Sequence, residues 1–396
     1  MSGLLRPNLH HHPDTIHAPR ACAPGRAGGC AHPAPARSKL GFAVLNKSLL
    51  AAPGLPPVTV GAETESSGYG LRHAHGSGSA EARHEGDLTL LETPIPNMPG
   101  ALKHVGVVGL GHMGHAFAVN LLQDGYQVLA YDRDVTRAKA LNGARAAAEL
   151  ADLASCDVVL TSLPDDDALA AVALGAGGLA DSLAPGAVHI SMSTVSPGVS
   201  RRVAEEHARR EQDYVAAPVL GNPDFACERK LFVLAAGPRA PLDEVRPLLQ
   251  RLGQRLFVIG EDPGLANLMK LGANTLIATT LESMGEVLAL LRKGGIDGRL
   301  AFDVLTNSLF DSRVHKTYGG KIVEGRFSPG MAVPLATKDI RLALAEAEHE
   351  AVPMPAASLV HDRLVAMAAR GWSDLDWSAL GQLAEAEAGL SDDQKK

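Results

Sequence analysis

The chain has few aromatic residues, few cysteines and no long apolar run. Phe, Trp and Tyr supply only 4% of its 396 residues, so a hydrophobic core has to be built from Ala, Leu and Val. Four cysteines without a C-x-x-C pair exclude a disulfide-rich secreted scaffold and predict a cytoplasmic protein. No apolar stretch reaches the roughly 18 residues of a membrane span, so no membrane partner is expected.

A surplus of positive charge is also missing. The formal net charge is −7, and Lys and Arg are scattered rather than clustered. Such a distribution offers no general attraction to nucleic acid or to an anionic membrane surface, and we expect neither as a partner. With 46% hydrophobic residues, the chain is long enough for one large or two medium domains.

Residues 1–100 differ in composition from the rest. They are rich in Pro, Gly, Ala and His and show neither helical nor strand periodicity, which predicts a disordered low-complexity extension. The histidines and the two cysteines of this segment lack the paired spacing of a structural zinc site, so no metal is expected. The folded part is predicted to begin near residue 103.

A nucleotide-binding pattern starts there. The apolar run HVGVVG (104–109) predicts a strand, and GLGHMG opens a segment with apolar residues at helical spacing. In the resulting G-x-G-x-x-G, the first glycine permits a tight turn, the second lets backbone approach a pyrophosphate, and the third lets the helix pack closely on the strand. The cofactor-binding residues expected in this turn are Gly109, Leu110, Gly111, His112, Met113 and Gly114.

The next strand bears on the choice of cofactor. QVLAYD (127–132) ends in Asp132, and 132 − 109 = 23 is the spacing at which a carboxylate meets the adenosine ribose hydroxyls of NAD. Arg133 follows directly, and a guanidinium here can instead bind the 2′-phosphate of NADP. We favour NAD, because Asp132 would repel that phosphate, and leave NADP open.

Further apolar runs predict strands at 157–163, 187–193, 214–220, 231–237 and 255–260. With helical or turn segments between most of them, they predict an α/β doubly wound sheet, whose ligands sit at the carboxyl ends of the strands. We therefore expect Leu163 and Pro164 beside the nucleotide, and the hydroxyls of Ser193 and Thr194 near the nicotinamide and the substrate. STVSP (193–197) equally fits a helix N-cap followed by proline.

From residue 264 onwards the pattern is helical. Residues 264–294 contain no proline and would span about 45 Å as one unbroken helix, long enough to join two domains. Lys270 and Asn274 share one face of this helix, since 274 − 270 = 4. Gly272 and Gly285 lower its helix propensity, which predicts close packing against another backbone at both positions.

Taken in order, GLGHMGHAFAVNLLQDGY, the SLP turn, STVSP, KLGAN and KDIRLAL resemble the β-hydroxyacid dehydrogenase family. That family includes 3-hydroxyisobutyrate dehydrogenase, tartronate semialdehyde reductase and glyoxylate/succinic semialdehyde reductase. The resemblance implies an N-terminal Rossmann domain over 103–263, an all-helical C-terminal domain over 264–390 joined to it by the long helix, and a homodimer or homotetramer. It makes Lys270 the catalytic lysine and Asn274 the substrate-binding asparagine. The cofactor contacts that it implies are Leu163, Pro164, Thr194 and Lys338.

The chemistry agrees with the role that the resemblance gives to Lys270. Hydride transfer to a carbonyl leaves negative charge on oxygen, which a positioned cation must stabilise and protonate. In the reverse direction the same group must accept a proton, so its pKa should be lowered by desolvation or nearby positive charge. The resemblance thus implies an NAD(P)-dependent oxidoreductase that acts on the CH–OH group of a short β-hydroxy acid or on a semialdehyde, similar to 3-hydroxyisobutyrate dehydrogenase.

One stretch departs from the family pattern. Where the family has D-A-P-V-S-G-G, this chain has AAPVLGN (216–222), so the serine and one glycine that bind the substrate carboxylate are missing. We expect backbone near Gly221, the amide of Asn222 and the hydroxyl of Ser193 to bind the substrate. Leu220 implies a different or more apolar acid, or a substrate without a carboxylate there.

Other activities on the same scaffold remain open. An imine-reductase-like enzyme and a non-catalytic cofactor-binding scaffold are the alternatives, although such relatives usually lack the helix lysine that Lys270 provides. A 6-phosphogluconate dehydrogenase is disfavoured, because its helical domain is much longer than residues 264–396.

Overall fold

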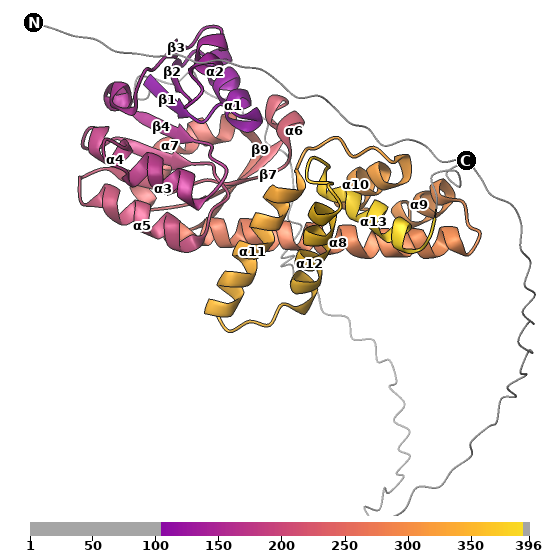
Figure 1. Ribbon diagram of the computed structural model, residues 1–396. Coiled ribbons are helices and arrows are strands. Elements are labelled where there is room, and N and C mark those ends of the chain that lie inside the picture. Colours follow the sequence, from indigo (N-terminus) through magenta and orange to yellow (C-terminus); the bar gives the residue numbers. More distant parts are fainter. Residues whose placement is uncertain (1–103, 391–396) are drawn as a thin grey trace, which may run out of the picture. The chain divides into compact units, whose positions relative to one another are not determined.

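The structure is a computed structural model that describes residues 104–390 (Figure 1). The disordered extension expected over residues 1–100 lies outside the described residues. Strands and helices alternate up to residue 260, and helices follow from residue 264 onwards. The expected fold class, a Rossmann sheet followed by a helical domain that a long helix joins to it, is confirmed.

A nine-stranded sheet forms the first part. Its strands are β1 (His104–Val108), β2 (Gln127–Tyr131), β3 (Arg145–Ala146), β4 (Val158–Thr161), β5 (Val188–Ser191), β6 (Asp213–Ala216), β7 (Val219–Leu220), β8 (Leu231–Ala236) and β9 (Gly253–Gly260). Their order is β3-β2-β1-β4-β5-β6-β8-β7, with β9 beside β8. Because β2 and β4 pair with opposite edges of β1, the strand order reverses there, and open α/β sheets bind ligands at such a switch point.

Helices alternate with these strands and cover them. They are α1 (His112–Gln123), α2 (Val135–Ala140), α3 (Asp166–Leu174), α4 (Leu179–Ser182), α5 (Pro197–Ala208), α6 (Pro223–Cys227) and α7 (Arg239–Arg251), with a 3₁₀ turn at Leu150–Ser155. Every residue of β4 and β5 is buried. This explains their continuous apolar runs, because a parallel strand between two helical layers has no solvent-facing side.

The segment expected as one strand, 214–220, is divided into β6 and β7. Ala217 and Pro218 lie between them, and both strands pair with β8 in the antiparallel direction. Pro218 has no N–H for a strand ladder, but its carbonyl accepts a hydrogen bond from the Leu234 N–H at 2.9 Å. The two-residue strand β3 was not expected, since it is too short to show an apolar pattern.

The helical part begins with α8, a helix of 30 residues. Its elements are α8 (Gly264–Lys293), α9 (Gly298–Thr306), α10 (Arg313–Glu324), α11 (Val333–His349), α12 (Pro355–Ala369) and α13 (Leu380–Glu387), with a 3₁₀ turn at Trp377–Ala379. A Cβ added to Gly285 would lie 2.7 Å from the Cα of Gly381, so close packing is confirmed there. The same expectation for Gly272 is wrong, because nothing lies within 4 Å of an added Cβ. The domain limits 103–263 and 264–390 stay a prediction.

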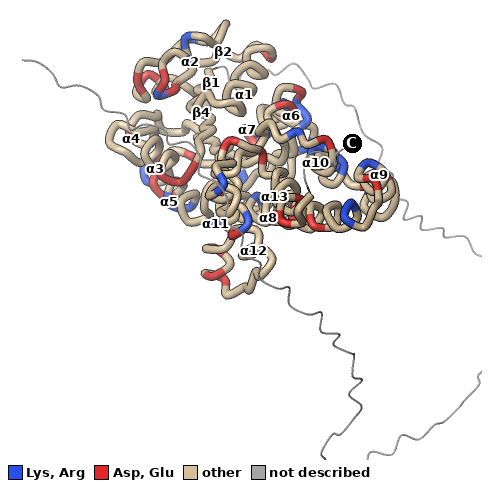
Figure 2. Tube along the Cα trace, turned by 45° about the vertical axis from the view of Figure 1, so that its right-hand side comes forward, with Lys and Arg blue, Asp and Glu red and all other residues tan. Residues whose placement is uncertain are grey.

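Charged residues of both signs are interspersed along the described part of the chain (Figure 2). Several of them pair along one helix, as Arg209 and Glu206 do at 2.6 Å on α5 and in the turn after it. Exposed pairs of this kind contribute little to stability. In residues 104–390, no helix is both long enough and apolar enough to cross a membrane.

A line of buried polar side chains links β4, β5 and α5. Thr161 Oγ1 lies 2.9 Å from His189 Nε2, His189 Nδ1 lies 2.8 Å from His207 Nε2, and His207 Nδ1 lies 2.7 Å from Gln212 Oε1. Gln212 Nε2 donates to the carbonyl of Leu183 at 2.6 Å, which makes its Oε1 the acceptor. Each histidine therefore carries its proton on Nδ1 and is neutral. Burial, and then the neighbouring His207, lowers the pKa of His189 well below 6.5, and burial also lowers the pKa of His207.

We expect the free energy of unfolding to fall as the pH drops below about 6.5. Unfolded histidines bind protons there, whereas burial keeps the folded pair neutral, so stability that is fully present above the unfolded pKa of about 6.5 is lost as the pH falls below it. Urea denaturation at several pH values measures the slope, and ¹⁵N shifts of the imidazoles report their protonation. His349→Gln, at the exposed end of α11, should leave the slope unchanged. A His189 ring that titrates near 6.5 would contradict this expectation.

Candidate active site

Three glycines stand where β1 leads into α1: Gly109 and Gly111 in the turn, and Gly114 in the first turn of the helix. Gly109 has a φ of 86°, which favours glycine, and a Cβ added to Gly114 would lie 1.8 Å from the carbonyl oxygen of Gly109. Gly111, in contrast, has no atom within 4 Å of an added Cβ. No side chain caps α1, so the N–H groups of its first turn are left for an anion. The turn therefore fits a pyrophosphate: tight at its two outer glycines and open at the middle one.

Asp132, directly after β2, is turned toward this glycine-rich turn. Its carboxylate accepts hydrogen bonds from the N–H of Leu110 at 2.7 Å and from the N–H of Asp134 at 2.9 Å, and its side chain is 8% exposed. Arg133 is exposed. The carboxylate is thus fixed against the candidate phosphate site, whereas the neighbouring guanidinium is in contact with solvent.

A buried polar chain joins α8 to α11. Lys270 Nζ donates to Asn274 Oδ1 at 2.9 Å, and Asn274 Nδ2 donates to Asp339 Oδ2 at 2.6 Å. The three residues are 8%, 3% and 2% exposed, in that order. Because Lys270 and Asn274 stand one turn apart, the amide carbonyl binds the ammonium group while the amide nitrogen reaches the neighbouring helix.

The pKa of Lys270 lies close to neutral pH. Burial lowers the pKa of Lys270 from its ordinary value of 10.5 to about 8; the negative charge of Asp339 opposes this shift, and the positive charge of Lys338 adds to it. A group with such a pKa is populated both as ammonium and as free amine close to neutral pH, which is what a group that gives and takes a proton requires.

Lys338 connects this cluster to the loop that follows β5. Its Nζ lies 2.9 Å from Asp339 Oδ1 and also donates to the carbonyl of Thr194. Ser193, the preceding residue, accepts a hydrogen bond on Oγ from the Leu163 N–H at 2.9 Å, so the loops after β4 and β5 meet at the edge of the cluster. The structure thereby links six residues that the sequence singled out: Leu163, Ser193, Thr194, Lys270, Asn274 and Lys338.

Two expected substrate contacts lie on a separate turn. Gly221 and Asn222 stand between β7 and α6, and Asn222 Oδ1 caps α6 by accepting a hydrogen bond from the Phe225 N–H at 2.9 Å. Among residues 104–390, no hydrogen bond joins this turn to Lys270 or Asn274. Their binding roles stay predictions.

The remaining expected residues differ in exposure. His112 and Pro164 are exposed, and Met113 is half-buried. The N-cap interpretation of STVSP is confirmed at Ser196, whose Oγ accepts a hydrogen bond from the Val199 N–H at 3.3 Å at the start of α5.

Two buried polar residues of this region were not expected from the sequence. Asp339 directly follows Lys338 in KDIRLAL, on an otherwise apolar helix face. Asn267 stands one turn before Lys270, is 0% exposed, and donates from Nδ2 to the carbonyl of Ser193 at 3.4 Å. The available signal was the recurrence of polar residues at 267, 270 and 274, a helical spacing within a mostly apolar segment.

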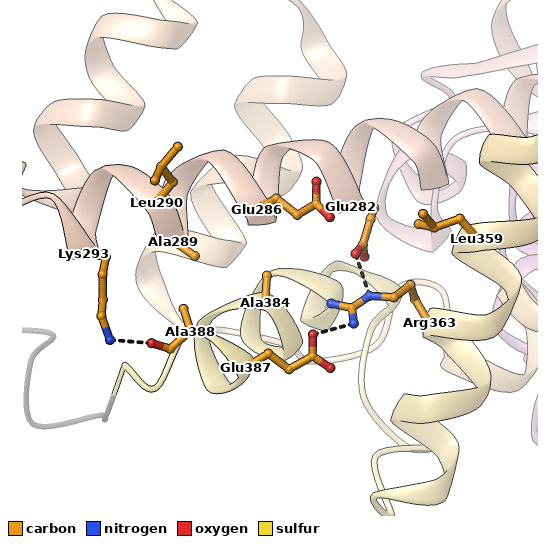
Figure 3. Close-up of a pocket in the computed structure, with 10 residues that line it drawn as sticks. All are labelled: Glu282, Glu286, Ala289, Leu290, Lys293, Leu359, Arg363, Ala384, Glu387 and Ala388. Carbon is orange, nitrogen blue, oxygen red and sulfur yellow. Dashed lines mark hydrogen bonds and ion pairs between the residues drawn. The ribbon is translucent and has the colours of Figure 1, made fainter. Parts of the chain in front are cut away.

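A pocket of about 550 Å³ lies farther along α8, where α12 and α13 pack against it (Figure 3). Glu282, 282 − 270 = 12 residues beyond Lys270, lies about 18 Å along the helix axis. Its carboxylate pairs with Arg363 at 2.6 Å, and Arg363 also binds Glu387 at 2.5 Å. None of the residues expected to bind cofactor or substrate lines this pocket.

A glycine-rich turn at the switch point and a buried lysine beside the loops after β4 and β5 are the features expected of a nicotinamide-dependent dehydrogenase. Comparison with protein families agrees. Residues 104–260 match the NAD binding domain of 6-phosphogluconate dehydrogenase, and residues 264–384 match a domain described as the NAD-binding domain of NADP-dependent 3-hydroxyisobutyrate dehydrogenase.

The matches to individual relatives cover almost the whole length of each relative. The oxidoreductase YfjR of Bacillus subtilis is 38% identical over 281 residues, which are 70% of this chain and 98% of the relative. Glyoxylate/succinic semialdehyde reductase 1 of Arabidopsis thaliana is 30% identical over 279 residues, 70% of this chain and 96% of the relative. The crystal structure of 3-hydroxyisobutyrate dehydrogenase (ygbJ) from Salmonella typhimurium superposes with a TM-score of 0.65 at 25% identity, covering 71% of this chain and 99% of that one. The chain belongs to the β-hydroxyacid dehydrogenase family and is an NAD(P)-dependent oxidoreductase that acts on CH–OH groups.

Substitutions at two glycines of the turn should separate folding from cofactor binding. Gly114→Ala places a Cβ against backbone and should destabilise the protein by about 1–3 kcal/mol or more. Gly111→Ala meets no protein atom, so the melting temperature should stay unchanged while the Kd for NAD(P)H rises at least about tenfold. Thermal unfolding and fluorescence titration measure the two effects. Equal cofactor affinity in Gly111→Ala and wild type would show that the pyrophosphate does not approach this backbone.

Proposed function

We propose that the protein reversibly reduces the carbonyl of a short semialdehyde or oxo acid to the corresponding hydroxy acid, such as a β-hydroxy acid, with Lys270 as the catalytic acid and base. The supporting observation is the buried chain from Lys270 through Asn274 to Asp339, which holds an ammonium group of lowered pKa next to the candidate nicotinamide site. A nicotinamide cofactor, when bound, would supply or accept the hydride. In the reductive direction Lys270 gives its proton to the substrate oxygen, and in the oxidative direction its free amine takes the proton from the hydroxyl.

Asn274 is proposed to hold the substrate. Its Oδ1 accepts from Lys270 and one hydrogen of its Nδ2 is donated to Asp339, which fixes the orientation of the amide. An amide nitrogen has two hydrogens, so the second is available for a substrate carboxylate or for the reacting oxygen. Asp339 therefore acts as a positioning residue that aims this donor.

We propose NAD as the preferred cofactor. Asp132 is held at the glycine-rich turn by the N–H of Leu110, in the place where a carboxylate meets the ribose hydroxyls. The family model described as NADP-dependent covers residues 264–384 and does not include Asp132 or Arg133. The exposed Arg133 is the group that would favour NADP if Asp132 lost its charge.

Substrate identity depends on the turn after β7. Leu220 replaces the serine of the family pattern, and Asn222 Oδ1 is engaged in capping α6. We propose that the substrate carboxylate is bound by Asn274, by Ser193 and by backbone near Gly221, beside a more apolar wall. The substrate class is tested by measuring turnover with both cofactors. The compounds are glyoxylate, succinic semialdehyde, tartronate semialdehyde, methylmalonate semialdehyde and 3-hydroxyisobutyrate. If the enzyme turned over none of these compounds but did reduce a cyclic imine, the imine-reductase alternative would be favoured.

A homodimer or homotetramer is also proposed, in the cytoplasm. Large apolar side chains of the helical part are exposed, among them Leu276 at 69%, Leu290 at 70% and Leu309 at 94%. Where exposed apolar side chains adjoin one another, the patch that they form typically marks a contact with another protein. Light scattering coupled to size-exclusion chromatography measures the state, and a monomer at micromolar concentration would contradict the proposal.

Lys270→Ala should lower kcat by at least about 100-fold while changing the Kd for NAD(P)H little, because a general acid or base acts on the chemical step. Lys270→Arg should not restore the rate, since a guanidinium stays protonated and cannot cycle a proton. Steady-state kinetics on the best substrate, with fluorescence titration of the cofactor, measure both. A Lys270→Ala enzyme with more than about half of the wild-type kcat would place the chemistry elsewhere.

The rates of oxidation and reduction should change with pH in opposite senses. Oxidation needs the free amine of Lys270, so its rate should rise with pH and level off above about 8. Reduction needs the ammonium form, so its rate should be highest below about 8 and fall above it. Profiles of kcat/KM in both directions measure this. The same sign in both directions would exclude Lys270 as the titrating group.

Asp132→Asn should shift cofactor preference toward NADPH by about tenfold, because it removes the repulsion of the 2′-phosphate and leaves Arg133 in place. The ratio of kcat/KM for NADH to that for NADPH measures the shift. Asp134→Asn, which changes a neighbouring exposed carboxylate, is the matched control. A wild-type enzyme that already prefers NADPH strongly would contradict the role given to Asp132.

A further inference from the structure

One buried acceptor near the proposed catalytic lysine has no partner. Asn267 is 0% exposed, and its Nδ2 donates to the carbonyl of Ser193, which fixes which end of the amide is nitrogen. Its Oδ1 is buried without a hydrogen-bond partner among the described residues. Buried polar atoms are nearly always paired, because an unpaired one has lost its water without compensation. An acceptor left in this state indicates a donor that reaches it in another state of the protein.

Lys270 is the donor that the helix geometry places there. Asn267, Lys270 and Asn274 follow one another at spacings of three and four residues, so all three lie within about 60° of one another around the axis of α8. The ammonium group has three hydrogens and is buried, yet only Asn274 Oδ1 accepts from it among the described residues. Lys270 thus has N–H hydrogens without an acceptor, one helical turn from the Asn267 oxygen that has no donor.

We infer that Asn267 is a positioning residue for Lys270: its Oδ1 accepts one hydrogen of the ammonium group when the cofactor is bound. This inference rests on the proposed function. Asn274 takes a second hydrogen from the other side, so the third is directed at the substrate oxygen. The two asparagines stand one turn before and one turn after the lysine. With both of them as acceptors, only one N–H of the ammonium group is left without a protein partner. The hydrogen bond from Asn267 Nδ2 to the Ser193 carbonyl holds this arrangement in place relative to the loop after β5.

The charges around Lys270 define what a substitution should do. Asp339 and Lys338 face it from α11, and the loop after β5 contributes the neutral residues Ser193 and Thr194. Asn267→Leu removes the acceptor at similar size and should lower the pKa of Lys270 by about one unit, whereas Asn267→Asp keeps an acceptor, adds a negative charge and should raise it by about one unit. Because the two variants act in opposite directions, a general loss of packing cannot imitate the result.

The test is made on the full-length protein with NADH bound. The pKa of Lys270 is read from the ¹³Cε shift of labelled lysine, assigned with Lys270→Arg, and does not depend on turnover. In addition, Asn267→Leu should lower kcat by about tenfold with KM within about threefold, since a hydrogen bond that orients the acid acts on the chemical step. Thr279→Val, on the same helix and away from the cluster, should change neither quantity. If Asn267→Leu does not fold, the isosteric Asn267→Asp carries the test by itself.

Two results would overturn the inference. An unchanged Lys270 pKa in every folded Asn267 variant would mean that Asn267 only ties α8 to the loop after β5. A rise of more than about tenfold in the Kd for NADH, with the lysine pKa unchanged, would mean that Oδ1 receives the carboxamide of the nicotinamide instead. A Lys270→Ala enzyme with near wild-type kcat would contradict the proposed function and not the pairing of Asn267 with Lys270.

Discussion

The proposed chemistry depends on holding one ammonium group out of water. Burial lowers the pKa of Lys270 to about 8, and a buried cation without compensation would be expelled from the core or neutralised altogether. Asn274 binds the ammonium group, Asp339 supplies negative charge behind that amide, and Lys338 limits how much of the compensation Asp339 provides. The balance leaves a lysine that is neither permanently charged nor permanently neutral.

This requirement explains how the two parts of the fold meet. Asp339 is on α11 and Lys270 on α8, so the chain of hydrogen bonds exists only when these helices pack together. Lys338 and Asn267 then bind the carbonyls of Thr194 and Ser193, which follow β5 at the carboxyl edge of the sheet. The candidate cofactor loop after β5 and the proposed acid/base group, Lys270, are therefore fixed relative to each other by the side chains of Asn267, Asn274, Lys338 and Asp339.

Much of this could be predicted from the sequence, for reasons that are local. The glycine spacing from 109 to 114 and the carboxylate at 132 are determined by backbone geometry within one βαβ unit, and the spacing of Lys270 and Asn274 follows from one helix. Contacts between distant segments could not be predicted in this way. Asp339 looked like one more charge beside Lys338, and its role appears only when α11 packs on α8. Gly272 and Gly285 look alike in sequence, yet only Gly285 faces another backbone, because that depends on where α13 lies.

Chemical rescue tests the central claim most directly. If Lys270 provides the proton, Lys270→Ala leaves a cavity in which a small primary amine can replace the lost group. Turnover of the Lys270→Ala enzyme should then rise with the concentration of methylamine and show no response to tetramethylammonium, which carries the same charge but has no proton to give. Equal acceleration by both cations would contradict the account, because the site would then need only a positive charge and not an acid and base.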